Sequence, residues 1–82
     1  MKERKAELPE GSYTASLFSG GTDRILKKLG EESAELIIAG KNRNSSEVVY
    51  EAADLVYHLL VMLADAGVDA GSVYEELASR RK

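Results

Sequence analysis

Apolar side chains recur every three or four residues along most of the chain, which is the spacing of a helix with one buried face. No segment alternates apolar and polar residues in the manner of a strand. The first predicted helix is short, with Ser12 as its N-cap and Phe18 near its end. Gly20 and Gly21 then end it, because glycine adopts positive φ without a steric penalty. The pattern predicts an all-α protein.

A second helix is predicted from Thr22 or Asp23 to Gly40, since glycine is typical of the C-terminal cap of a helix. Its buried face is formed by Ile25, Leu26, Leu29, Leu36 and Ile37. Residues 41–46 (KNRNSS) have the composition of a loop that connects this helix to the next one. A short connection of this kind favours two helices that lie side by side in opposite directions.

The third helix is predicted to begin after Asn44, because Asn44 and Glu47 have the spacing of a capping box, and to continue to about Gly67. Asp69 is the candidate N-cap of a final helix, which ends in the basic segment 79–82 (SRRK). The apolar residues of this final helix are Val73, Tyr74, Leu77 and Ala78. Four helices are therefore expected.

The third helix has a wide apolar surface, which covers about half of its circumference. The residues on this surface are Val48, Val49, Ala52, Leu55, Val56, Leu59, Leu60, Met62, Leu63 and Ala66. A contact with one neighbouring helix needs less apolar surface, so we expect burial against several helices. In a chain of 82 residues, the economical interpretation is a small helical bundle of about four helices, completed by homodimerisation. The alternative is a monomer in which Leu60 or Val49 is partly exposed.

The totals indicate one small domain, residues 1–82, with a thin margin of stability. Residues 1–11 are charged and are closed by Pro9 and Gly11, which predicts a truncated or frayed first helix. The chain has no cysteine, so disulfides and thiolate zinc sites are excluded, and a cytoplasmic location fits. The net charge is −3, from 11 basic and 14 acidic residues, and the basic residues are scattered. We therefore expect no nucleic-acid partner.

We also expect no membrane partner. The longest mostly apolar run, from Leu55 to Ala66, is interrupted by His58 and Asp65. It is much shorter than the roughly 20 residues that a membrane span needs. No secretory signal precedes it.

Acidic residues on the two longer helices lie beside the apolar faces instead of opposite them. On the third helix they form a stripe with one histidine, and the stripe consists of Glu47, Glu51, Asp54, His58 and Asp65. The corresponding residues of the second helix are Lys28, Glu31, Glu32 and Glu35. If the two helices pack as an antiparallel pair, two acids from each converge in a half-buried cluster, which requires a counter-charge. Mg²⁺, or Mn²⁺, fits because hard cations prefer oxygen ligands and Mg²⁺ commonly binds a substrate phosphate as well.

These residues also have structural interpretations. With 30% charged residues, acidic stripes arise by chance on amphipathic helices, and Lys28 and Glu32 have the spacing of a surface ion pair. His58 follows Asp54 by one turn, so it is a metal ligand, a phosphate contact or a hydrogen-bond partner of a neighbouring acid.

The tyrosines and the start of the first helix are open to two interpretations as well. Tyr50 and Tyr57 are predicted to pack with their hydroxyl groups toward solvent. Ser12, Tyr13 and Thr14 form either a helix cap with its hydrophobic contact or part of a site. The spacing of these residues alone does not decide between the two.

The motif Glu31-Glu32-x-x-Glu35, followed after 15 residues by Glu51-x-x-Asp54, resembles the paired motif of the all-α NTP pyrophosphatase superfamily. Longer segments resemble one of its families, the phosphoribosyl-ATP pyrophosphohydrolases. These segments are SYTASL at 12–17, ILKKLGEESAE at 25–35, IIAGKN at 37–42 and VYEAADLVYHLLVML at 49–63. The resemblance covers roughly residues 2 to 80 and is more specific than the acids alone.

This resemblance implies a homodimeric helical bundle that hydrolyses phosphoribosyl-ATP to phosphoribosyl-AMP and pyrophosphate, the second step of histidine biosynthesis, with Mg²⁺. The metal ligands that it implies are Glu32, Glu35, Glu51 and Asp54. Glu31 is the candidate catalytic residue, as general base or water-positioning group, although the sequence does not choose among the acids. The candidates for binding the substrate are Lys28, Lys41, Asn42 and His58, with ion pairing and helix capping as the structural alternatives.

The start of the chain departs from the family pattern, in which a longer helix precedes the segment ERK, residues 3–5 here. This departure again predicts a truncated first helix, which would alter the dimer edge and leave the acidic motifs whole. Some relatives are fused to the cyclohydrolase of the next pathway step, for which 82 residues leave no room.

Two other functions remain as alternatives. A house-cleaning nucleoside triphosphate pyrophosphohydrolase would use the same carboxylates with a different base pocket. A non-catalytic helical interaction module would bind a partner through its apolar faces and leave its acids solvated.

Overall fold

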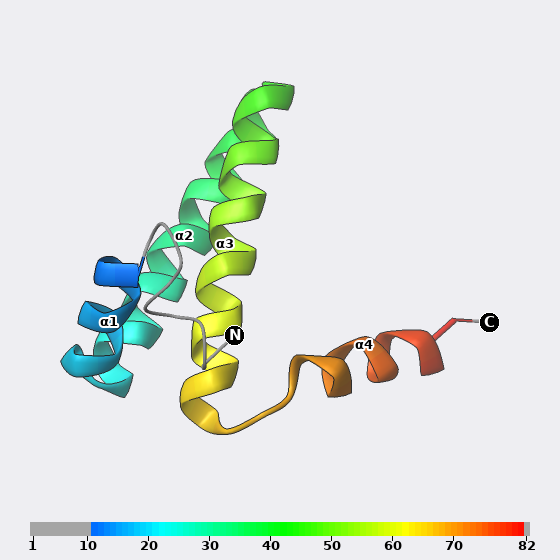
Figure 1. Ribbon diagram of the computed structural model, residues 1–82. Helices are drawn as coiled ribbons and strands as arrows, with labels where there is room; N and C mark the ends of the chain where they lie inside the picture. Colours follow the sequence, from blue (N-terminus) through cyan, green and yellow to red (C-terminus); the bar gives the residue numbers. More distant parts are fainter. Residues whose placement is uncertain (1–10, 82) are drawn as a thin grey trace.

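The computed structural model describes residues 11–81, which form four helices and contain no strand (Figure 1). The helices are α1 (Gly11–Gly20), α2 (Thr22–Asn42), α3 (Ser45–Ala66) and α4 (Ala70–Ser79). The predicted all-α class is confirmed. The truncated or frayed helix predicted for residues 1–11 lies outside the described residues, except for Gly11, the first residue of α1.

Four predicted boundaries are confirmed by local geometry. Gly21, with φ 91°, separates α1 from α2, and Gly67, with φ 74°, follows α3. Glycine is suited to both positions because a Cβ atom disfavours positive φ. Asn44 caps α3 by accepting a hydrogen bond from the Glu47 N–H at 3.1 Å, and Asp69 caps α4 in the same manner.

The end of α2 differs from the prediction. The helix continues beyond Gly40 through Lys41 and Asn42, so the loop expected over 41–46 is reduced to two residues. Arg43 adopts the left-handed conformation, with φ 56°, and its N–H donates to the Gly40 carbonyl at 3.2 Å. The left-handed residue that closes the helix is therefore Arg43, and Gly40 stays helical.

Helices α2 and α3 lie side by side and antiparallel, and α1 packs against the first part of α2 (Figure 1). Leu17, Ile25 and Val61 contribute one side chain from each of α1, α2 and α3 to a common core, and none is more than 1% exposed. Partly buried side chains surround this core, namely Tyr13, Phe18, Tyr57 and Met62. Burial of each large apolar side chain contributes about 1.5–3 kcal/mol, so this core holds α1 against the α2–α3 pair.

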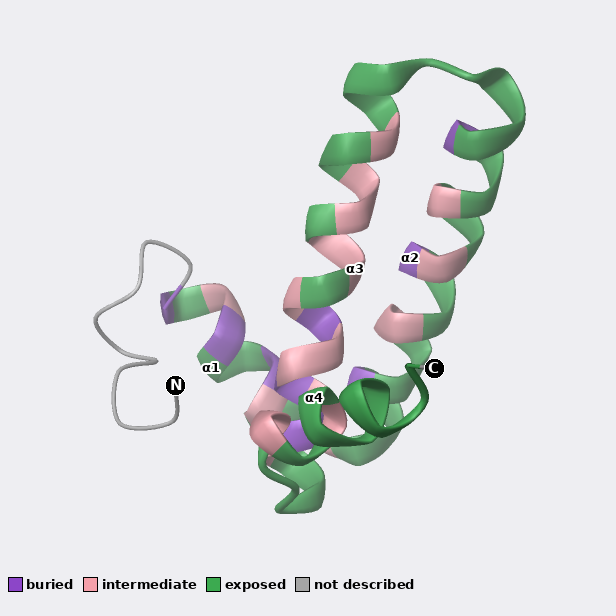
Figure 2. Ribbon diagram, turned by 90° about the vertical axis from the view of Figure 1, so that its right-hand side faces the viewer, coloured by how far each residue is buried: buried purple, intermediate pink, exposed green. Residues whose placement is uncertain are grey.

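A single chain covers only part of the wide apolar surface predicted on α3 (Figure 2). Of its residues, Leu63 is buried, whereas Val49 is 69% exposed and Val56 is 48% exposed. Val61, which the predicted surface did not include, is fully buried. Helix α4 extends away from the α2–α3 pair in Figure 1 and has no buried residue. Within residues 11–81, no helix combines the length and the apolar content that crossing a membrane requires.

Candidate metal and substrate site

Glu32 of α2 and Asp54 and His58 of α3 meet where the two helices pack together. Each residue offers one atom that can ligate a metal, and these atoms all lie within 4.8 Å of one another. Asp54 and His58 share one face of α3 because they are four residues apart. Glu32 and His58 are buried, at 9% and 3% exposure. Among residues 11–81, this group has the spacing that suits a divalent cation.

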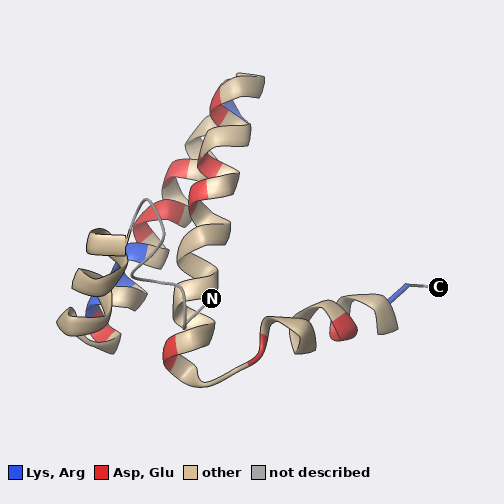
Figure 3. Cartoon of the chain, viewed as in Figure 1, with Lys and Arg blue, Asp and Glu red and all other residues tan. Residues whose placement is uncertain are grey.

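Further acidic residues lie in the middle parts of α2 and α3, which run side by side (Figure 3). Desolvation raises the pKa of Glu51, and the negative charges of Glu35, Asp54 and Glu47 raise it further. The Glu51 carboxylate therefore interacts with Glu35 across the two helices and with Asp54 on its own helix. Glu35 is exposed and Glu51 is partly exposed, and the group within 4.8 Å contains Glu32, Asp54 and His58. We call the four acids Glu32, Glu35, Glu51 and Asp54 the acidic cluster.

The centre of the acidic cluster is electrostatically unfavourable without a cation. Burial raises the pKa of Glu32, and a hydrogen bond with Asp54 and the negative charge of Asp54 raise it further. His58 and Lys28 act in the opposite direction. The ionised form of Glu32 is therefore disfavoured in this place. A bound divalent cation opposes this effect, because its charge favours the ionised carboxylate.

Lys28 lies at the edge of the acidic cluster and balances only part of its charge. The Nζ atom is 3.5 Å from Glu31 Oε1 and 3.8 Å from Glu32 Oε2. The interaction with Tyr13 raises the pKa of Lys28, burial opposes this effect, and Glu31 and Glu32 raise the pKa further. The ammonium group has three N–H donors, so it is suited to contact a phosphate at this edge.

His58 connects Asp54 to helix α1. Its Nδ1 is 2.8 Å from the backbone carbonyl oxygen of Asp54 and 3.5 Å from the Asp54 Oδ1. A carbonyl only accepts, so Nδ1 carries a hydrogen, and in the neutral ring the Tyr13 hydroxyl donates to Nε2 at 2.8 Å. Both ring nitrogens thus have partners, and direct metal coordination by His58 requires one of these bonds to open.

A second link joins α1 to α3, between the hydroxyl groups of Thr14 and Tyr57. The rings of Tyr13 and Tyr57 stack with their centroids 6.2 Å apart and their planes at 25°, and the His58 ring meets both edge-on. We call Tyr13, Thr14, Tyr57 and His58 the aromatic seam. Burial raises the pKa of the Tyr13 hydroxyl, in agreement with its position inside the seam.

The contacts in the aromatic seam contradict the prediction for the Tyr57 hydroxyl and decide between the two interpretations of Tyr13 and Thr14. The Tyr57 hydroxyl does not point to solvent, because Thr14 binds it. Helix α1 begins at Gly11, so Ser12, Tyr13 and Thr14 lie within its first turns and the predicted cap at Ser12 is wrong. Tyr13 and Thr14 both contact α3. The sequence holds one sign of these contacts: an aromatic residue precedes a polar one in both segments, Tyr13-Thr14 and Tyr57-His58. Periodicity alone does not show that the two segments contact each other.

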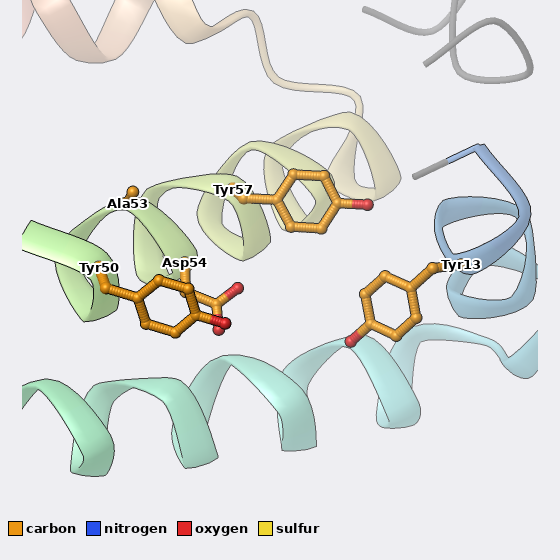
Figure 4. A pocket seen from close by; sticks show the side chains of 5 residues that line it. All are labelled: Tyr13, Tyr50, Ala53, Asp54 and Tyr57. Carbon is orange, nitrogen blue, oxygen red and sulfur yellow. The ribbon is translucent and has the colours of Figure 1, made fainter. Parts of the chain in front are cut away.

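An open cleft of about 340 Å³ lies beside the acidic cluster (Figure 4). It is lined by Tyr13, Tyr50, Ala53, Asp54 and Tyr57. Asp54 belongs to the cleft and to the acidic cluster, so a molecule in the cleft lies next to the candidate metal ligands. A volume of a few hundred cubic ångströms suits a small-molecule ligand.

The remaining predicted site residues lie at different distances from this centre. Glu31 pairs with Lys28, and its side chain is 49% exposed. Lys41 and Asn42 are exposed in the last turn of α2. They follow Glu32 by nine and ten residues, which corresponds to about 14 Å along the helix axis. Within one chain they therefore lie apart from the acidic cluster.

Comparison with known proteins assigns the chain to a family. The sequence model of the phosphoribosyl-ATP pyrophosphohydrolase family matches residues 1–81. The phosphoribosyl-ATP pyrophosphatase of Leptospira biflexa is 51% identical over 80 residues, which are 98% of this chain and 87% of that protein. The phosphoribosyl-ATP pyrophosphatase of Lactiplantibacillus plantarum is 52% identical over 80 residues, which are 98% of this chain and 76% of that protein.

A longer relative matches over the same part of the chain. The histidine biosynthesis bifunctional protein HisIE of Bacillus subtilis is 54% identical over 80 residues. The match covers 98% of this chain and 38% of that protein. The family resemblance inferred from the longer segments is thus confirmed across almost the whole sequence, and the chain belongs to the phosphoribosyl-ATP pyrophosphohydrolase family.

Proposed function

We propose that this protein hydrolyses phosphoribosyl-ATP to phosphoribosyl-AMP and pyrophosphate, the second step of histidine biosynthesis. The acidic cluster beside an open cleft carries the proposal, in a chain whose relatives are named phosphoribosyl-ATP pyrophosphatases. A triphosphate is strongly negative, so acids can face it only with a cation between them. The site thus supports a cation-dependent reaction at a phosphoric anhydride.

The cation that we propose is Mg²⁺, with Mn²⁺ as a substitute, because both are hard ions that prefer oxygen ligands. The proposed ligands are Glu32, Glu35, Glu51 and Asp54. Two observations support these ligands. Ligand atoms of Glu32, Asp54 and His58 all lie within 4.8 Å of one another, and the negative charges of Glu35 and Asp54 raise the pKa of Glu51. When bound, the ion lowers the pKa of a bound water and offsets the charge of the leaving pyrophosphate.

The residues of the chain hold the substrate and move one proton. Glu31 is the proposed general base: it accepts a proton while the water oxygen bonds to phosphorus and the bond to the leaving group breaks. Its partly exposed carboxylate, which Lys28 holds in place, is accessible for this role. Lys28, Lys41 and Asn42 are the proposed contacts to phosphate or ribose oxygens. The ring nitrogens of His58 already have hydrogen-bond partners, so its proposed role is to hold Tyr13 and Asp54 in place beside the substrate.

The proposed working form is a homodimer. Large apolar side chains are exposed on three helices, including Leu26, Ile37, Ile38, Val49, Val56 and Leu77. Extended exposed apolar surface of this kind marks an interaction site. Light scattering should give the mass of two chains, and the mass of one chain would contradict the proposal. The cytoplasm is the proposed location, since a charged phosphorylated metabolite does not cross membranes unaided.

The function is tested by comparing substrates under identical conditions. With Mg²⁺ present, pyrophosphate release from phosphoribosyl-ATP should be far faster than from ATP or any other ordinary nucleoside triphosphate. Equal or reversed rates would favour the house-cleaning pyrophosphohydrolase. Absence of pyrophosphate release from every one of these compounds would favour the non-catalytic interaction module.

A further inference from the structure

The cleft beside the acidic cluster has an apolar, aromatic part that the proposed chemistry does not use. We propose that this part, formed by Tyr50, Ala53 and Tyr57 with Tyr13 at its end, is the subsite that binds the purine base of the nucleotide. The inference rests on the proposed function, because that function supplies a nucleotide as the ligand. It adds the binding mode of the base and a residue, Tyr50, that no part of the acidic motif includes.

The helical register of α3 creates the space for a base. Tyr50 and Tyr57 are seven residues apart, so they lie on the same face of the helix and about 10.5 Å apart along its axis. Ala53 and Asp54 lie between them. The Ala53 methyl group leaves its part of the helix surface low, and the Asp54 carboxylate is directed between α3 and α2. Aromatic rings stack with their centroids about 4.5–7 Å apart, so one planar ring fits between two others separated by two helical turns.

One wall of this subsite is already rigid. The Tyr57 hydroxyl is bound by Thr14, and the Tyr13 hydroxyl is bound by His58. The two rings stack on each other, so their positions are set before a ligand enters. Tyr50 forms the opposite wall, and its side chain is 68% exposed, which leaves aromatic surface for a base to cover.

The charges around the cleft orient the nucleotide. Asp54 lies beside the aromatic part, on its α2 side, and also belongs to the acidic cluster, as Figure 4 shows for its carboxylate between α2 and α3. Phosphate groups are attracted to this side only through a cation, and they are repelled by bare carboxylates. The uncharged base is therefore directed over the tyrosines and the phosphates toward the cation. Stacking on aromatic side chains binds any base, because every base has a π-face.

The experiment measures binding of AMP and of ribose 5-phosphate to the full chain by calorimetry with Mg²⁺ present. The wild-type protein should bind AMP at least about tenfold more tightly than ribose 5-phosphate, since only AMP carries a base. Tyr50→Ala should weaken AMP binding about tenfold, and Tyr50→Phe should stay within about twofold of wild type, because stacking needs the ring and not the hydroxyl. Ala53→Leu should also weaken AMP binding, because the larger side chain fills the gap.

Tyr74→Ala is the matched control, because Tyr74 is an exposed tyrosine of α4 and does not line the cleft. It should bind AMP as wild type does, and thermal melting should show that all four variants fold. Equal affinity of the wild type for AMP and ribose 5-phosphate would overturn the proposal. Wild-type AMP affinity in both Tyr50→Ala and Ala53→Leu would overturn it as well. If the expected AMP pattern appears while phosphoribosyl-ATP is not hydrolysed, the base subsite stands and the proposed function fails.

Discussion

The aromatic seam buries Thr14 and His58 and the acidic cluster buries Glu32, and the two regions differ in the charge of the partners that these side chains meet. In the seam, each donor meets an acceptor: Tyr13 binds His58, and Thr14 binds Tyr57. In the cluster, carboxylates meet carboxylates, and the nearby ammonium of Lys28 is shared with Glu31. Among residues 11–81, no buried side-chain nitrogen or oxygen lacks a hydrogen-bond partner.

The difference in partners indicates a structural role for the aromatic seam and a functional role for the acidic cluster. Paired polar groups in a partly buried place stabilise one arrangement of helices. Like charges gathered in a partly buried place lower stability, and they persist in a fold where a ligand of opposite charge compensates them. We therefore expect changes in the seam to affect stability first, and changes in the cluster to affect activity first.

The largest effect is expected for Asp54→Asn in the acidic cluster. The substitution keeps the shape of the side chain and removes one proposed metal ligand, so activity with phosphoribosyl-ATP should fall by at least about 100-fold. Steady-state pyrophosphate release measures the loss, and Glu51→Gln should behave in the same way. The matched control is Glu76→Gln on α4, where an acid is also replaced by its amide. Turnover that survives Asp54→Asn and Glu51→Gln would remove the basis of the metal site.

The next effect is expected for Tyr13→Phe in the seam. It removes the hydroxyl that donates to His58 and leaves a buried ring nitrogen unpaired, which costs about 1–3 kcal/mol of unfolding free energy. Urea unfolding measures this loss. The chain has one histidine, so the ¹⁵N signals of a histidine-labelled sample report the His58 ring alone and should shift. Tyr74→Phe serves as the control, and equal unfolding curves for the two variants would contradict the role of the hydroxyl.

A pH dependence of stability is expected from the acidic cluster. Folding raises the pKa of Glu32 and of Glu51 above the ordinary value of 4.5, chiefly through desolvation. Above pH 4.5 the metal-free folded protein therefore binds more protons than the unfolded chain. These two groups destabilise the fold increasingly as the pH rises through their raised pKa, and they do not destabilise it at lower pH.

Thermal melting at several pH values, with a chelator or with Mg²⁺, checks this expectation. Mg²⁺ should raise the melting temperature at pH 8 and have little effect at pH 4.5, where the carboxyl groups hold protons that compete with the ion. Glu32→Gln should reduce the pH-dependent loss in the metal-free protein. An unchanged pH profile in Glu32→Gln would show that Glu32 is not the group that titrates.

The smallest effect is expected where an acid is paired and exposed. Glu76 and Arg80 form an ion pair of 3.0 Å on α4, and their side chains are 61% and 72% exposed. Glu76→Gln should change the unfolding free energy by no more than about 0.5 kcal/mol, because solvent and salt screen such a pair. A loss above about 1 kcal/mol in urea unfolding would mean that α4 contributes more to the fold than its exposure indicates.

Much of the fold could be predicted because helix boundaries depend on a few neighbouring residues. The helix boundaries lie where the sequence predicted them at four residues. Two are glycines with positive φ, Gly21 and Gly67, and two are N-caps, Asn44 and Asp69. The prediction failed at Gly40, where glycine was expected to close the helix and Arg43 took the left-handed conformation instead. The sequence does not indicate that Arg43 takes the left-handed conformation, because glycine adopts that conformation most readily and Gly40 lies three residues before it.

Glu32 and Asp54, two of the four proposed metal ligands, meet at the helix crossing, as expected from the acidic stripes on an antiparallel helix pair. Sequence reasoning did not find the aromatic seam or the cleft with Tyr50. Both depend on how α1 and α3 meet, and the periodicity within one helix carries no information about that contact.

By itself, the sequence determined four helices, their approximate ends, their apolar faces and the acids that share one edge, since each of these follows from interactions over a few residues. Only the tertiary structure decided which polar groups satisfy one another. Tyr13 and His58 are separated by 45 residues, and their hydrogen bond exists because burial of Leu17, Ile25 and Val61 sets the position of α1. The same packing left the acidic cluster without enough positive charge, because the helix crossing that buries the core also brings its carboxylates together.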